Sequence, residues 1–172
     1  MLHHLSRREV ILGLASSYIL YPKETQPKTK TRVATEYIAV HGSFTYPDMD
    51  IGAKDIDRWH RQRGFFQIGY HCIIRRDGTI EQGRPDHLIG AAVYGYNDVS
   101  WHVCLVGGKS RQTEGWENNY TNAQFRALGS VLKKSGRAYP DAMVLGHRDF
   151  PRMNRGCPGF DIMDWFGPDI SA

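Results

Sequence analysis

The sequence predicts an α/β fold in which a single mixed central β-sheet is flanked by helices. Three observations predict this fold. Short apolar runs of strand length alternate with amphipathic segments of helical spacing, an Asp-Gly turn joins two of the runs as a hairpin, and 172 residues suit one domain. Apolar residues make up 41% and aromatic residues 12% of the chain, which excludes a disordered or collagen-like protein.

The predicted strands and helices lie between residues 37 and 166. We expect strands at residues 37–40, 70–75, from 80 onward, 103–106 and 142–145. We expect helices at residues 52–63, 121–135 and 161–166. Gly64 provides the stop of the first helix, and the Thr121-Asn122-Ala123-Gln124 capping box opens the second.

The N-terminal region differs from the rest in composition. Residues 1–21 place a short basic region before an apolar run, and this order resembles a twin-arginine export signal. The alternative is an amphipathic helix that packs on its own domain or on a partner. Residues 22–32 hold two Pro and four Lys or Arg, which indicates a linker, so the predicted domain spans residues 33–172.

The net positive charge of the chain comes from the same region. The net charge is +4, and residues 1–32 carry all of it, with six Lys or Arg against two Glu. The remaining residues carry 16 basic and 16 acidic side chains. We therefore expect no direct nucleic-acid binding, and we expect residues 1–32 to contact a membrane or the cell envelope.

Two histidines and a cysteine form a candidate metal site. His41 follows the first strand, His147 follows the strand at 142–145, and Cys157 lies in a Pro-Gly turn ten residues later. Imidazole and thiolate ligands suit zinc, and three protein ligands leave the fourth position open, as in catalytic sites. Because the chain has eight His and three Cys, spacing alone leaves isolated histidines and a buried cysteine as the alternative.

Seven motifs in a fixed order carry a resemblance to a known family. They are VHGS at 40–43, WHRQRG at 59–64, GYHCIIRRDGT at 69–79, GYN at 95–97, VCLVGG at 103–108, GHRD at 146–149 and CPGFD at 157–161. In this order they resemble the zinc N-acetylmuramoyl-L-alanine amidases of the type-2 family, which includes the peptidoglycan recognition proteins. The resemblance is strongest to the small amidases, called lysozymes, of the odd-numbered T phages, and it covers residues 33–166.

The resemblance implies a cofactor, a site and a reaction. The family's zinc ligands fall on His41, His147 and Cys157, and its catalytic tyrosine falls on Tyr70. The catalytic lysine of the phage enzymes falls on Arg155, which stays protonated and can act only by its charge. The implied reaction is hydrolysis of the amide between N-acetylmuramic acid and L-alanine in peptidoglycan, with Zn2+ as the Lewis acid.

One departure from the family pattern leaves a second function open. Members often carry a His shortly before the GYN motif, where this chain has Ala92. His87 and His102 are near it in sequence and are candidates to replace the missing imidazole. A non-catalytic peptidoglycan-binding module is therefore the alternative to an endolysin-like enzyme.

The resemblance also bears on partners and location. The phage relatives bind their own RNA polymerase, so a regulatory complex with a phage RNA polymerase is a further alternative; we expect a monomer. As a phage endolysin the protein would pass from host cytoplasm to the periplasm and cell wall. With a functional twin-arginine signal it would be exported instead.

Overall fold

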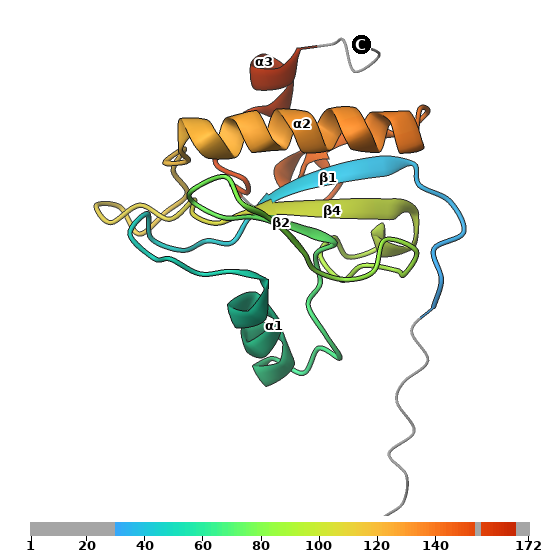
Figure 1. Cartoon of the computed structure of the whole chain (residues 1–172), viewed down its shortest axis with the longest axis horizontal. Coiled ribbons are helices and arrows are strands. Elements are labelled where there is room, and N and C mark those ends of the chain that lie inside the picture. The colour runs from blue at the N-terminus through green and yellow to red at the C-terminus, as the bar shows by residue number, and fades with distance from the viewer. Residues whose placement is uncertain (1–29, 154–155, 168–172) are drawn as a thin grey trace, which may run out of the picture.

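The computed structural model describes residues 30–153 and 156–167 (Figure 1). The twin-arginine-like segment at 1–21, most of the predicted linker and Arg155 lie outside these described residues. Within the described residues, no helix is long and apolar enough to cross a membrane.

One five-stranded sheet forms the centre of the domain. Its strands are β1 (Tyr37–Gly42), β2 (Cys72–Ile74), β3 (Ile80–Gln82), β4 (Ser100–Leu105) and β5 (Met143–Gly146), in the order β3-β2-β4-β1-β5. The β2–β3 hairpin is antiparallel and the other neighbours pair in parallel. The predicted single mixed sheet is therefore confirmed. The Asp-Gly turn lies where it was expected, since the Arg75 amide donates to the Thr79 carbonyl across it.

Helices cover both faces of the sheet. They are α1 (Ala53–Gln62), α2 (Asn122–Ala138) and α3 (Ile162–Phe166); α2 and α3 lie on one side of the sheet and α1 lies on the other (Figure 1). The predicted capping box is present, because the Thr121 hydroxyl accepts a hydrogen bond from the Gln124 amide and the Gln124 side-chain oxygen accepts one from the Thr121 amide. Helix α2 runs three residues past the predicted end, since hydrogen bonding continues to the Tyr139 amide, which donates to the Ser135 carbonyl.

The α2 face of the sheet holds the main apolar core. Alternate residues of the strands point to this face, among them Ile38, Val40, Val103 and Leu105. They pack against Leu128, Val131 and Leu132 of α2 and Ile162 of α3. Their burial removes most of the apolar surface of these elements from water, and it holds β1, β4 and β5 in a rigid frame.

The opposite face combines a smaller apolar cluster with buried polar side chains. Ile56 of α1 packs with Ile73 and Cys104 of the sheet. On the same face, toward the carboxyl ends of the parallel strands, lie the fully buried imidazoles of His41 and His102. The strands therefore present two unlike faces, one apolar throughout and one that carries titratable groups.

The last residues of the predicted linker contact the domain. Thr31 forms a β-bridge with Leu88, and the Arg32 amide donates to the His87 carbonyl. The Arg32 guanidinium donates to the hydroxyls of Thr35 and Tyr139. These contacts fix where the chain enters the domain; the boundary at residue 33 itself stays a prediction.

Candidate active site

Parallel pairing of β1 and β5 brings the two candidate histidine ligands together. The strand register places Val40 opposite Gly146, so the next residues, His41 and His147, leave the same edge of the sheet side by side. Their ring centroids are 4.7 Å apart. His41 is fully buried, and His147 is 8% exposed at the start of a short 3-10 helix (His147–Asp149).

Cys157 reaches this edge from the loop before α3. Its Sγ accepts a hydrogen bond from the Gly42 amide at 3.3 Å, and its carbonyl accepts one from the Arg148 amide at 2.8 Å. The next carbonyl, of Pro158, accepts a hydrogen bond from the Tyr120 hydroxyl at 2.6 Å. Three contacts from separate elements thus hold the thiol beside the two imidazoles.

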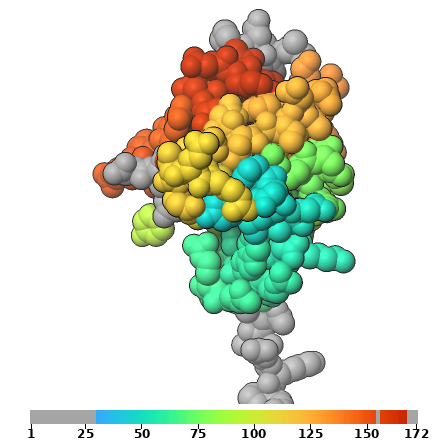
Figure 2. All heavy atoms as spheres, turned by 90° about the vertical axis from the view of Figure 1, so that its left-hand side faces the viewer, coloured from blue at the N-terminus to red at the C-terminus, as the bar shows by residue number. Residues whose placement is uncertain are grey.

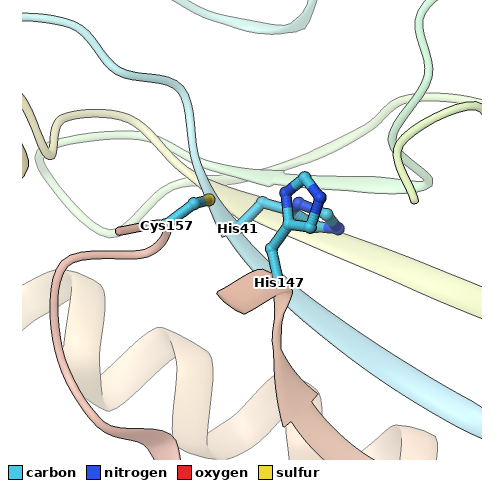
Figure 3. A group of neighbouring side chains, drawn as sticks. All are labelled: His41, His147 and Cys157. Carbon is cyan, nitrogen blue, oxygen red and sulfur yellow. The ribbon is translucent and has the colours of Figure 1, made fainter. Parts of the chain in front are cut away.

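The three side chains converge on one point (Figure 3). One potential ligand atom from each of His41, His147 and Cys157 lies within 4.8 Å of the others. Among the described residues, no other group of three or more His, Cys, Asp or Glu has this arrangement. The triple that spacing alone could not separate from isolated side chains is therefore a spatial cluster.

The protonation state of His41 suits metal coordination. Burial lowers the pKa of His41 well below its usual value, and the neighbouring His147 and His71 lower it further. The imidazole is therefore neutral at pH 7, which is the form that can donate a lone pair to a metal. Its Nδ1 is buried and has no hydrogen-bond partner among the described residues.

Two further histidines lie behind His41. His41 Nε2 and His102 Nδ1 are 3.2 Å apart and share a hydrogen bond. The His102 amide donates to His71 Nδ1 at 2.9 Å, and His71 Nε2 donates to the Leu88 carbonyl at 2.9 Å. Burial lowers the pKa of His71 to about 4, so this ring is neutral. His71 is thus a hydrogen-bonded core residue.

Tyr70 lies on the open side of His41. Their ring centroids are 5.1 Å apart, and Tyr70 lines the cleft described below. Burial raises the pKa of Tyr70 well above its usual value, and the thiols of Cys104 and Cys157 raise it further. Tyr70 is therefore protonated at neutral pH and carries a hydrogen that it can donate.

A cleft of about 890 Å³ opens above the cluster. His147, Cys157 and Tyr70 line it together with aromatic side chains that the sequence did not single out. These include Phe44, Tyr94 and Trp116. On one side the cleft is flanked by residues 43–46 and 107–117, which lie side by side (Figure 2) and pair through the Thr45–Gly108 bridge.

Glycines allow the wall of the cleft to approach the candidate ligand residues closely. A Cβ on Gly42 would lie 2.2 Å from the Tyr120 hydroxyl oxygen and 2.8 Å from the Trp116 ring. A Cβ on Gly156 would lie 2.7 Å from the same indole. Trp116 is therefore packed between the residues that follow His41 and precede Cys157.

The remaining candidates have separate places in the structure. Ala92 lines the cleft, and Asn97 fixes the loop around it by accepting hydrogen bonds from the Ala92 and Val93 amides. His87 is exposed and His102 is fully buried behind His41, outside the cleft lining, so neither replaces an imidazole at Ala92. Arg155, predicted to act by charge, is not among the described residues.

His60 and His102 are the buried polar residues whose place the sequence did not reveal. His60 lines the cleft beside Tyr70 and accepts a hydrogen bond from the Gly69 amide. His102 lies two residues before Cys104 on the same face of β4, so alternation along that strand was the signal that could have placed it near His41.

Comparison with known proteins supports one family. Residues 30–160 match the model of the N-acetylmuramoyl-L-alanine amidase family. The endolysin of Enterobacteria phage K11 is 42% identical over 134 residues, which cover 78% of this chain and 87% of the endolysin. The endolysin of Escherichia phage T7 is 38% identical over 137 residues, with coverage of 80% and 89%.

A solved structure agrees with these sequence matches. The N-acetylmuramoyl-L-alanine amidase LysC from Clostridium intestinale superposes with a TM-score of 0.67 at 25% identity, over 79% of this chain and 84% of LysC. The family and the peptidoglycan amidase activity that the motifs predict are thereby confirmed. The chain belongs to the N-acetylmuramoyl-L-alanine amidase family.

Proposed function

We propose that this amidase cleaves the bond between N-acetylmuramic acid and L-alanine with a zinc ion held by His41, His147 and Cys157. The observation that carries the proposal is the convergence of these three side chains within 4.8 Å beside the cleft. Parallel pairing of β1 and β5 produces that convergence, because it brings together residues more than 100 positions apart in sequence.

The chemistry of the three side chains fits zinc. Two imidazoles and one thiolate form a donor set of intermediate softness, and three protein ligands leave one tetrahedral position for water or substrate. The buried Nδ1 of His41, which has no hydrogen-bond partner among the described residues, is the kind of atom that a metal would satisfy. When bound, zinc supplies Lewis-acid chemistry, which polarises a carbonyl and makes water a stronger nucleophile near pH 7.

Tyr70 donates a hydrogen bond during the reaction. Attack on the scissile carbonyl places negative charge on its oxygen, and a donor aimed at that oxygen stabilises the transition state. The protonated Tyr70 phenol beside His41 meets this need. Arg155, which lies outside the described residues, corresponds in sequence to the catalytic lysine of the phage enzymes, and we assign it the role of supplying positive charge without exchanging a proton.

The lining of the cleft suits a glycan with an anionic peptide. Phe44, Tyr94 and Trp116 offer apolar ring surface, against which the faces of sugar rings pack well. Arg63 is the single Lys or Arg among the described residues that line the cleft, and the lining includes no Asp or Glu. Stem peptides of peptidoglycan carry carboxylates, so Arg63 complements their charge.

The experiment that tests this function identifies the bond that is cut. Purified peptidoglycan is incubated with the full-length protein, and new amino termini and new reducing sugar ends are measured in parallel. We expect new L-alanine amino termini in the parent and none with the Cys157→Ala variant. New reducing ends, or amino termini of another residue, would contradict the proposed bond. Muropeptide binding without any cleavage would favour the binding-module alternative.

A further inference from the structure

His102 makes a contact with His41 that the reaction described above does not use. His102 lies on β4 opposite Ala39 of β1, whose small side chain leaves room on this face for a ring. Its Nδ1 is 3.2 Å from His41 Nε2, and both imidazoles are fully buried. His102 does not line the cleft, so it has no route to the substrate.

Coordination by His41 determines which way this hydrogen bond points. A neutral imidazole has one N–H donor and one nitrogen with a free lone pair. Nε2 of His41 is engaged by His102, whereas Nδ1 has no hydrogen-bond partner among the described residues and is the nitrogen left for a metal. If Nδ1 supplies its lone pair, the hydrogen is on Nε2, and Nε2 must donate it to His102 Nδ1.

The surroundings hold the His102 ring in place for this contact. The His102 amide donates to His71 Nδ1 at 2.9 Å, and the two rings stack with centroids 5.5 Å apart and planes at 15°. Gly90 lies against the same ring, where a Cβ would come within 2.2 Å of His102 Cδ2. Backbone, stacking and a glycine therefore define the position of an imidazole whose own Nε2 has no hydrogen-bond partner among the described residues.

We propose that His102 is a positioning residue for the metal site, which fixes the tautomer and orientation of His41 by accepting a hydrogen bond from its Nε2. This inference rests on the proposed zinc site. Partners that accept a hydrogen bond from a coordinating histidine raise its basicity and hold its ring, and their loss typically weakens metal binding by about 10- to 100-fold. In this chain the partner is a second buried imidazole on the neighbouring strand.

The test compares three replacements of His102 with a control elsewhere. Asn can place an amide oxygen near the position of Nδ1, whereas Gln carries its amide one bond further out and Leu has no acceptor. His87→Asn is the control, because His87 is an exposed histidine outside the cleft. For each full-length protein we would measure zinc affinity by chelator competition, the visible spectrum of the cobalt-substituted protein, and the melting temperature of the metal-free protein.

The expected pattern separates positioning from simple packing. His102→Leu weakens zinc binding by about 10- to 100-fold and shifts the cobalt spectrum. Its metal-free melting temperature falls, because the buried Nε2 of His41 loses its hydrogen-bond partner, whereas a loss of packing alone would leave the cobalt spectrum unchanged. His102→Asn recovers most of the affinity, His102→Gln recovers less, and His87→Asn matches the parent.

Two results would overturn parts of the account separately. A parent protein that binds no zinc would refute the zinc site and this inference with it. A parent that binds zinc, combined with a His102→Leu variant of equal affinity and identical cobalt spectrum, would refute the role of His102 alone. If His102→Leu does not fold, the zinc affinities of His102→Asn and His102→Gln are compared instead. Equal affinities in these two variants would refute the positioning role of His102.

Discussion

The two faces of the central sheet bury polar groups in different ways. On the α2 face a fully buried polar side chain is Gln124, whose amide nitrogen donates to the carbonyls of Ile74 and Val106 and whose oxygen accepts from the Thr121 amide. On the opposite face His41 and His102 are equally buried, yet each has one ring nitrogen without a partner among the described residues.

This difference separates structural from chemical roles. A buried polar group without a hydrogen-bond partner lowers the stability of the fold by about 1–3 kcal/mol. A fully hydrogen-bonded group avoids this cost, which suits a structural role. Gln124 meets that condition and joins α2 to β2 and to the residue after β4. Nδ1 of His41 does not, and His41 belongs to the cluster with His147 and Cys157, where a metal would satisfy that nitrogen. The unpaired nitrogens of His41 and His102 thus lie on the face that carries the candidate metal site.

Replacing one buried thiol on each face gives the strongest contrast. Cys157→Ala removes a proposed zinc ligand, and we expect amidase activity to fall by about 10³-fold or more, since the metal supplies several kcal/mol of transition-state stabilisation. Cys72→Ala removes a buried thiol from the α2-face core. We expect it to retain zinc and activity, with a lower melting temperature. Equal activity loss in the two variants would erase the contrast.

Removing one hydroxyl tests the role of Tyr70 without disturbing the metal. Tyr70→Phe is expected to lower kcat by about 10²- to 10³-fold, as for the loss of one oxyanion donor, while zinc affinity stays at the parent value. Tyr37→Phe is the matched control, because Tyr37 packs on Tyr96 and Phe150 away from the cleft. Steady-state kinetics on soluble muropeptides provide the measurement. A parent-like kcat in Tyr70→Phe would remove it from the mechanism.

Creating a cavity on the α2 face should change stability and leave chemistry intact. Leu128 is fully buried in the main core, and Leu128→Ala is expected to reduce the free energy of unfolding by about 2–5 kcal/mol. At a temperature where the variant stays folded, kcat should remain close to that of the parent. Denaturant unfolding and the amidase assay measure the two quantities. A large fall in kcat of the folded variant would show that the faces are coupled.

Acid should destabilise the metal-free protein through its buried histidines. Burial lowers the pKa of His60 and of His71 to about 4, whereas an unfolded histidine titrates near 6.5. Below pH 6.5 the unfolded state therefore binds more protons, and stability falls by up to about 1.4 kcal/mol per pH unit for each such histidine. Carboxylates with lowered pKa values, such as Asp57, contribute at lower pH.

Thermal unfolding of the metal-free protein between pH 7.5 and 5 measures this dependence. We expect the melting temperature to be nearly constant above about pH 6.5 and to fall below it. A flat profile down to pH 5 would show that these histidines titrate normally in the folded protein.

Local patterns in the sequence predicted the elements and the edge on which the candidate ligands lie. Apolar runs marked the strands, the capping box marked the start of α2, and polar residues after two apolar runs marked His41 and His147, although β1 continues through His41 to Gly42. The lengths of the strands could be predicted less well from the sequence. Strand β4 starts at Ser100 and not at Val103, because pairing with Tyr37 of β1 extends it, and that partner is not visible in the local sequence.

The parts of the site that the sequence did not reveal depend on contacts between distant segments. Trp116 and Phe44 come from loops without hydrophobic periodicity, and their rings meet only because the two loops pair. His102 lies just before the apolar run at 103–106 that predicts a strand. The run alone therefore does not place His102 on the same strand face as Cys104. The functions predicted for residues 1–32, the RNA polymerase complex and the monomeric state stay predictions.

The dependence of activity on bound zinc tests the central claim most directly. The full-length protein is stripped with a chelator, and zinc is restored stepwise while bound metal and release of L-alanine amino termini are measured together. We predict that activity is lost on stripping, rises in proportion to zinc, and reaches a plateau at one equivalent, and that Cys157→Ala recovers none. Full activity in zinc-free protein, or recovery in Cys157→Ala equal to that of the parent, would contradict a catalytic metal held by His41, His147 and Cys157.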